Sequence, residues 1–222
     1  MPRLLSVQYR CHPQIASLAS ALFYGGRLGS GVSAADRPAL LPGLPPLAFV
    51  DCRGREERAA WGGSVFNQKE AREVVRLARL LVAHGLPGAE VGIICLFRAQ
   101  VGLIREGLCE APGGADPDGG EPAALADLTE IDVATVDSFQ GQEKKVIVLS
   151  TAFTGSGAFT ADPHRINVAL TRAKHHLVIV GHGEALQNSK LWAKVVRRSA
   201  DARVGELEAG LAGPSGGGAS GC

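Results

Sequence analysis

The sequence lacks the short motifs that build several common catalytic sites. No Gly-x-x-x-x-Gly-Lys-Ser/Thr stretch occurs among the 222 residues, which excludes a complete nucleoside triphosphatase of the phosphate-loop type. There is no His-Glu-x-x-His pair, and no Gly-x-Ser-x-Gly turn joins a strand-like run to a helix-like run. Zinc-dependent and serine hydrolases therefore have no support.

Long apolar runs are missing as well. None approaches the ~20 residues that a membrane-spanning helix needs, and the first residues carry too short an apolar stretch for a signal peptide. We therefore expect no membrane partner. Patterned sequence begins almost at once, which is typical of a piece of a longer protein.

Cysteine content and net charge give no sign of a metal site or a uniformly basic surface. The five cysteines contain no Cys-x-x-Cys pair, and their odd number argues against a disulfide framework. This favours reduced thiols in an intracellular protein. The 23 Lys and Arg residues nearly balance the 22 Asp and Glu residues, so the net charge is +1. Any nucleic-acid surface must then come from local patches.

Apolar runs of strand length alternate with helical patterns along the chain. Strands are expected at 47–50, 91–96, 131–136, 146–150 and 177–180, and helices at 13–24, 68–84, 101–108, 165–173 and 184–198. This alternation predicts an α/β fold in which helices cover both faces of a mainly parallel sheet. Ligands of such folds bind at the carboxyl ends of the strands, so functional residues are expected in the turns that follow strands.

Composition suggests one domain with two irregular segments. Residues 1–200 carry the α/β pattern, and 201–222 form a Gly/Ser-rich stretch that we expect to be a flexible tail. Residues 111–123 are acidic and rich in Gly and Pro, which predicts a disordered surface insertion. Asn67 followed by Glu70 forms a capping-box-like start for the next helix.

Three polar clusters do not fit simple packing. They are Gln-Tyr-Arg-Cys-His-Pro at 8–13, Asp-Ser-Phe-Gln-Gly-Gln-Glu at 137–143 and Asn-Val-Ala-Leu-Thr-Arg-Ala-Lys at 167–174. At the third cluster, the expected helix places Arg165 and Arg172 two turns apart on one face. An arginine on an inner face favours a bound anion, although Arg165 could equally form a structural salt bridge.

In this order, the three clusters resemble motifs of the second RecA-like domain of superfamily 1 helicases, in the up-frameshift and senataxin-like branch. That domain carries Gln-Tyr-Arg-x-His-Pro, Val-Asp-x-Phe-Gln-Gly-x-Glu and Asn-Val-Ala-Leu-Thr-Arg-Ala-Lys, matched here at 8–13, 136–143 and 167–174. The resemblance extends from about residue 4 to about residue 198. Similarity over 40–51 points, more weakly, to the helicases with zinc fingers of the GRF type. Cys11 departs from the Met that is frequent in the first motif.

The resemblance implies roles at a nucleotide. Arg10 and Arg172 would contact the γ-phosphate of ATP bound on another domain and act as arginine fingers. Tyr9 would stack on the adenine. Glu143 would approach the nucleotide and link its state to the nucleic-acid groove.

Further residues are implied near the turn and the nucleic acid. Gln140 and Gly141 would shape the turn at the nucleotide, with Gly141 allowing close approach of the backbone. Thr135 and Ser138 would lie near backbone phosphates, and Asn67 is a further candidate. The alternative that Ser138 and Asn67 are only capping residues stays open.

The resemblance also implies partners. ATP and Mg²⁺ would be held mainly by a first RecA-like domain in cis, and the motor would move 5′ to 3′ on single-stranded DNA or RNA, in the nucleus. This chain alone would be inactive. One alternative is a stand-alone nucleic-acid-binding or regulatory fragment without turnover. Another, an unrelated nucleotide-binding α/β enzyme, would need a Gly-rich turn after the first strand, and none is apparent.

Overall fold

A six-stranded parallel sheet forms the centre of the computed structural model, which describes residues 6–60, 63–110, 127–154 and 162–211. The strand order is β10-β3-β9-β8-β6-β7, and every neighbouring pair is parallel. The strands are β3 (Leu47–Asp51), β6 (Val91–Cys95), β7 (Asp132–Thr135), β8 (Lys144–Ser150), β9 (Ala173–Gly181) and β10 (Ala200–Asp201). The predicted α/β fold is confirmed.

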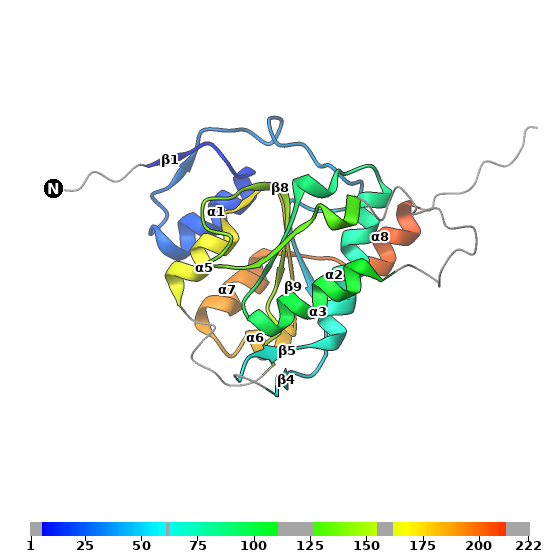
Figure 1. Ribbon diagram of the computed structural model, residues 1–222. Coiled ribbons are helices and arrows are strands. Elements are labelled where there is room, and N and C mark those ends of the chain that lie inside the picture. The colour runs from blue at the N-terminus through cyan, green and yellow to red at the C-terminus, as the bar shows by residue number, and fades with distance from the viewer. Residues whose placement is uncertain (1–5, 61–62, 111–126, 155–161, 212–222) are drawn as a thin grey trace, which may run out of the picture.

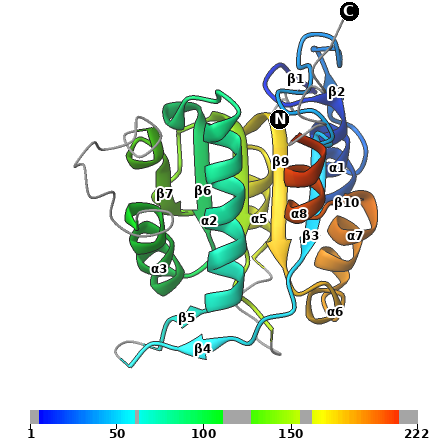
Figure 2. The same cartoon turned by 90° about the vertical axis from the view of Figure 1, so that its right-hand side faces the viewer.

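Helices cover both faces of the sheet (Figures 1 and 2). One face carries α2 (Gln68–Ala83), α3 (Arg98–Cys109) and α8 (Val204–Leu211), which contact one another through α2. The other face carries α1 (Pro13–Phe23), α5 (Pro163–Leu170) and α7 (Lys190–Arg198), of which α5 and α7 both contact α1.

Side chains that alternate along the central strands fill a separate core on each face. In β9, Val178 and Val180 join the core beneath α2, whereas Leu177 and Ile179 join the core beneath α1. Parallel strands that are buried on both faces must be apolar throughout. This explains the uninterrupted Val-Ile-Val-Leu run at 146–149.

Two short sheets mark the opposite ends of the molecule (Figure 2). β1 (Val7–Gln8) pairs in parallel with β2 (Gly29–Ser30) near the end where the central strands begin, which we call the amino edge. β4 (Glu57–Arg58) pairs antiparallel with β5 (Val65–Phe66) at the end where they finish, which we call the carboxyl edge. A short 3-10 turn, η1 (Gly88–Glu90), leads into β6.

Two expectations about the C-terminal part are wrong. The single helix expected at 184–198 is divided into α6 (Gly183–Leu186) and α7, because the chain turns at 187–189 before α7 buries Trp192. Residues 204–211 do not form the tail expected from residue 201, because they fold as α8, whose Val204 and Leu207 are buried in the core beneath α2. The expected insertion at 111–123 and residues 212–222 lie outside the described residues.

The described part of the chain carries four free thiols. Among the described residues, Cys11, Cys52 and Cys95 are buried free thiols, and Cys109 is an exposed one. None of the described helices is both long and apolar enough to cross a membrane.

Candidate functional site

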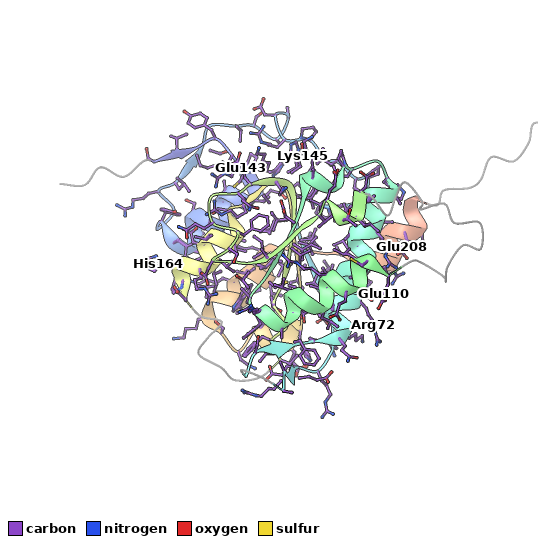
Figure 3. All side chains as sticks on the ribbon, in the orientation of Figure 1. Arg72, Glu110, Glu143, Lys145, His164 and Glu208 are labelled. Carbon is purple, nitrogen blue, oxygen red and sulfur yellow. The ribbon has the colours of Figure 1, made fainter. Side chains whose placement is uncertain are left out.

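Three chain segments meet at the amino edge of the sheet. Arg10 lies in the turn after β1, Glu143 directly precedes β8, and Arg172 directly precedes β9. Figure 3 shows Glu143 at this edge, beside Lys145 at the start of β8. The expectation that candidate site residues follow strands does not hold for Glu143 and Arg172, because their turns lead into β8 and β9. Arg10 does follow a strand, but β1 is not part of the central sheet.

Glu143 holds two cations at this edge. One carboxylate oxygen forms an ion pair with Nε of Arg10, and the other lies 2.9 Å from Nζ of Lys174. The hydrogen bond from Lys174, followed by that from Arg10, lowers the pKa of Glu143. Arg10 also donates from Nη1 to the carbonyl oxygen of Thr171 at 3.1 Å. With side chains 38% and 37% exposed, Arg10 and Glu143 remain open to a ligand.

Arg172 brings a second guanidinium group to the same place. Its Nη1 reaches the carbonyl oxygen of Gln142 only at 3.4 Å, and its Nε is buried with no hydrogen-bond partner in the described part of the chain. Burial lowers the pKa of Arg172, and the positive charge of Arg10 lowers it further. A buried donor without a partner is costly. An anion bound between the two arginines would satisfy this donor and offset their repulsion.

Tyr9 lies next to this cluster as an exposed aromatic residue. It is 69% exposed, and its ring lies against the backbone of Gly31. A Cβ atom added to Gly31 would come within 2.1 Å of Cε1 of Tyr9. The absence of a side chain at residue 31 therefore allows the ring to adopt this position, and much of the ring stays accessible to a planar ligand.

Thr135 and Ser138 lie at the carboxyl edge, as expected for residues that follow a strand. Thr135 ends β7 and donates from Oγ1 to Oγ of Ser138 at 3.2 Å. Beside them, Asp137 accepts two hydrogen bonds from Arg165, at 3.1 and 2.9 Å. Of the two interpretations of Arg165, the salt bridge is the one observed. The expectation that Arg165 and Arg172 share one helix face is wrong, because α5 ends at Leu170 and Arg172 lies beyond it.

The segment 136–143 connects the two edges. It leaves β7 at the carboxyl edge, buries Phe139 against β6 and ends at the amino edge before β8. A Cβ atom on Gly92 would come within 2.5 Å of Cζ of Phe139, which shows how closely the ring lies on the strand. Gln140 is exposed, and Gly141 has a φ of +90°, a left-handed conformation that favours glycine.

Asn67 has a buried side chain, unlike Thr135 and Ser138. It is 0% exposed, and its side chain accepts a hydrogen bond from the amide of Glu70 at 3.1 Å at the start of α2. This geometry favours the capping interpretation over a nucleic-acid contact. The reciprocal bond of the expected capping box does not form, because the Asn67 amide donates to Gln100 at 2.8 Å instead.

Comparison with known proteins decides the family. The family model described as an AAA domain (AAA_12) matches residues 1–184. The chain is 37% identical over 196 residues, 88% of its length, to the 5'-3' DNA helicase ZGRF1 of Mus musculus. It is 35% identical over 207 residues, 88% of its length, to regulator of nonsense transcripts 1 of Caenorhabditis elegans. Over 202 residues, 86% of its length, it is 34% identical to the ATP-dependent helicase NAM7 of Saccharomyces cerevisiae.

The chain belongs to the superfamily 1 helicases. It matches only part of these relatives, spanning 10% of ZGRF1, 18% of the worm protein and 20% of NAM7. A solved C-terminal domain of a possible DNA helicase from Lactobacillus plantarum WCFS1 superposes with a TM-score of 0.51 at 14% identity, covering 87% of this chain and 98% of that one. This likeness supports the fold. The chain is thus a second, C-terminal helicase motor domain, and the match to ZGRF1 agrees with the similarity noted over 40–51.

Arg37 of this helicase domain was not singled out from the sequence. It donates to the carbonyl oxygens of both Arg10 and Tyr9, at 2.8 and 3.1 Å. The composition of the segment around Arg37 predicts only a loop, so the sequence provided no reason to expect contacts between Arg37 and the Tyr9–Arg10 backbone. The available signal was Ser33 followed three residues later by Asp36, a spacing typical of a side-chain-stabilised turn.

Glu70 has a buried role that its place in the capping-box pattern did not indicate. It is 0% exposed and accepts hydrogen bonds from Oγ of Ser150 and the amide of Ala152, both at 2.7 Å. Burial raises its pKa to about 7. Ala152 has a φ of 52°, so this carboxyl group holds a left-handed turn directly after β8. The capping-box pattern of the sequence pairs Glu70 with Asn67, three positions away, whereas the observed partners of its carboxylate are remote in the chain.

Proposed function

We propose that this chain is the C-terminal half of an ATP-dependent 5'-3' DNA or RNA helicase and supplies two arginine fingers to a nucleotide held by a first motor domain. The observation that carries this proposal is the convergence of Arg10 and Arg172 at the amino edge, where the buried Nε of Arg172 has no hydrogen-bond partner among the described residues. Planar guanidinium groups suit the oxygens of a triphosphate. Tyr9, exposed beside them, suits stacking on adenine.

The residues at this edge have separate tasks in the proposal. Arg10 and Arg172 bind the terminal phosphate oxygens and stabilise the charge that shifts during phosphoryl transfer, an effect that can reach ~10³-fold in rate. Glu143 and Lys174 orient Arg10 when no phosphate is present. No group of three or more His, Cys, Asp or Glu in the described part of the chain could hold a metal ion. We assign Mg²⁺ to the first motor domain.

The carboxyl edge is proposed to contact the single strand. Thr135 and Ser138 present hydroxyl groups there, which are ordinary ligands of backbone phosphates. Because the segment 136–143 joins this edge to Glu143, closure of the two domains on a nucleotide would move the strand contacts as well. The name of the mouse relative, a 5'-3' DNA helicase, supports DNA and this polarity for the present chain.

The test is nucleic-acid-stimulated ATP hydrolysis by a two-domain protein that carries a first motor domain ahead of this chain. Arg172→Ala is expected to lower kcat by ~10³-fold, because one finger is removed. Arg203→Ala, an 80% exposed side chain on the C-terminal segment, is the matched control and should leave kcat unchanged. Equal rates for wild type and Arg172→Ala would refute the arginine-finger assignment.

The isolated chain provides the second arm of this test. It should not hydrolyse ATP, since its described part has the fingers without a phosphate-binding loop. Its affinity for a single strand, measured at two salt concentrations, addresses the alternative of a stand-alone binding module. Strong salt-dependent binding with no effect of nucleotide in the two-domain protein would favour that alternative.

A further inference from the structure

We infer that Arg37 is a positioning residue that sets the conformation of the Tyr9–Arg10 backbone, and thereby the aim of both side chains at the nucleotide. This inference rests on the proposed function. Arg37 donates from Nε to the carbonyl oxygen of Arg10 at 2.8 Å and from Nη2 to the carbonyl oxygen of Tyr9 at 3.1 Å. One rigid guanidinium group thus bridges two successive peptide units.

A compact turn holds Arg37 in place. The amide and hydroxyl of Ser33 each donate to the carboxylate of Asp36 at 2.7 Å, and the Asp36 amide donates back to Oγ of Ser33 at 3.3 Å. The Arg37 amide donates to the carbonyl oxygen of Ala34 at 3.2 Å, and its Nη1 donates to that of Asp36 at 2.9 Å. The side chain therefore leaves a turn whose shape is fixed by its own hydrogen bonds.

The chain beyond this turn is fastened to the central sheet. His176, buried at the start of β9, accepts a hydrogen bond from the amide of Leu40 at 2.8 Å. His175 lies 2.9 Å from the carbonyl oxygen of Pro38 through Nδ1. These contacts attach the segment that carries Arg37 to β9, the strand that follows Arg172. The positions of both proposed arginine fingers therefore depend on the same strand.

Gln8 completes the arrangement from the other side of the Tyr9–Arg10 backbone. Its Oε1 accepts from the amides of Arg10 and Cys11 at 2.8 and 2.7 Å, and its Nε2 donates to the carbonyl oxygen of Cys11 at 3.0 Å. Gln8 thus holds the amides of Arg10 and Cys11, and Arg37 holds the carbonyl oxygens of Tyr9 and Arg10. The backbone that carries the first finger is fixed on both polar sides before any ligand binds.

Arg37 acts through this backbone and not on the phosphates. Its Nε, Nη1 and Nη2 all donate to carbonyl oxygens of the chain, so its donors point into the protein. Tyr9 has an additional constraint, because its ring lies against Gly31. Changing Gly31 should therefore displace the ring alone, whereas changing Arg37 should disturb both Tyr9 and Arg10.

Hydrogen exchange of the isolated chain tests the structural half of this inference. Arg37→Ala should speed the exchange of the Arg10 and Cys11 amides by about ten-fold, because loss of the bridge loosens the turn that Gln8 also holds. Arg37→Lys, with a single donor group, should give a smaller increase. Arg27→Ala is the matched control, since the exposed side chain of Arg27 donates to the nearby carbonyl oxygen of Tyr24 and not to the Tyr9–Arg10 backbone among the described residues. Unchanged exchange in Arg37→Ala would overturn the inference.

Steady-state ATP hydrolysis by the two-domain protein tests the functional half. Arg37→Ala should lower kcat by on the order of 10- to 100-fold through misplacement of Arg10. Gly31→Ala should raise KM for ATP while kcat changes little. In an Arg10→Lys background, Arg37→Ala should have a much smaller effect on kcat, because the two changes act on the same group.

The outcomes separate this inference from the proposed function. If Arg172→Ala abolishes turnover but Arg37→Ala matches wild type, the arginine-finger proposal stands and the role of Arg37 is overturned. Full additivity of Arg37→Ala and Arg10→Lys would also overturn it. A wild-type two-domain protein without turnover would instead remove the proposed function and the role that rests on it.

Discussion

Glu143 forms an ion pair with Arg10 across 133 residues of sequence, directly in front of the strand β8. The same carboxylate pairs with Lys174 at the start of β9. Arg10 is therefore held by an anion of the protein itself at the place where a phosphate is proposed to bind. Binding of the nucleotide would replace Glu143 by a phosphate as the anionic partner of Arg10. Without nucleotide, Glu143 therefore spares Arg10 the free-energy cost of an unpaired, partly buried charge.

Glu143→Gln should show that the pairing of Glu143 with Arg10 serves activity more than it serves stability. The pair is partly exposed, and exposed ion pairs contribute at most about 1 kcal/mol, so we expect the free energy of unfolding to change by less than about 1 kcal/mol. The kcat/KM for ATP in the two-domain protein should fall about ten-fold, because Arg10 of the free enzyme loses the group that orients it before phosphate binds. Denaturant unfolding and steady-state kinetics measure the two quantities, with Glu206→Gln as control. A large loss of stability with normal kcat/KM would contradict this expectation.

Glu70 should make stability depend on pH. Its pKa is raised from 4.5 to about 7 by burial, so the folded chain binds a proton that the unfolded chain releases. The stabilising contribution of this proton is complete below about pH 4.5 and is lost as the pH rises through about 7, a change of about 3 kcal/mol. Urea unfolding between pH 4.5 and 8 measures it.

Glu70→Gln provides the comparison for that measurement. The amide resembles the protonated carboxyl group, so the variant should lack this loss of stability at rising pH. Glu106→Gln, an exposed change on α3, should keep the wild-type profile. Parallel pH profiles for wild type and Glu70→Gln would show that Glu70 is not the group responsible.

Asn67→Ala distinguishes the capping role from a nucleic-acid contact. Loss of the bond to the Glu70 amide should lower the free energy of unfolding by about 1–2 kcal/mol. Single-strand affinity, measured on protein that is fully folded, should stay the same because the side chain has no exposed surface. Ser138→Ala should show the reverse, with normal stability and weaker strand binding. Normal stability but weaker strand binding in Asn67→Ala would restore Asn67 as a nucleic-acid ligand.

Leu207→Ala tests whether α8 is part of the domain. Leu207 is 7% exposed and lies in the core beneath α2, so its truncation should cost about 2–3 kcal/mol of unfolding free energy. Glu206→Ala, on the same helix with a 70% exposed side chain, should cost under about 0.5 kcal/mol. Thermal or denaturant unfolding of both variants decides the point. Equal stabilities would mean that residues 204–211 behave as a tail after all.

The sequence by itself determined the α/β class, five of the six strands of the central sheet and the helicase family. Buried parallel strands must be apolar throughout, so the runs at 91–96, 146–150 and 177–180 were recognisable without any partner. The cap at Asn67 was also readable, because a cap acts within one helical turn. Arg10 and Arg172 could be identified from the sequence because each lies within a motif formed by consecutive residues, at 8–13 and 167–174.

Only the tertiary structure decided where these residues lie. It placed Arg10, Glu143 and Arg172 at the amino edge and Thr135 with Ser138 at the carboxyl edge, because the segment 136–143 runs from one edge of the sheet to the other. It showed α8 in a segment whose glycine content had suggested a tail, since burial against α2 outweighs weak helix propensity.

The hydrogen bonds of Arg37 and Glu70 were likewise decided by the fold. Arg37 bonds residues 27 and 28 positions away, and Glu70 bonds residues 80 and 82 positions away. A local pattern contains no information about such partners, because side-chain hydrogen bonds depend on which atoms the packed chain brings within about 3 Å. The motifs could assign the family, whereas the orientation of Arg10 depends on contacts that exist only after the sheet has formed.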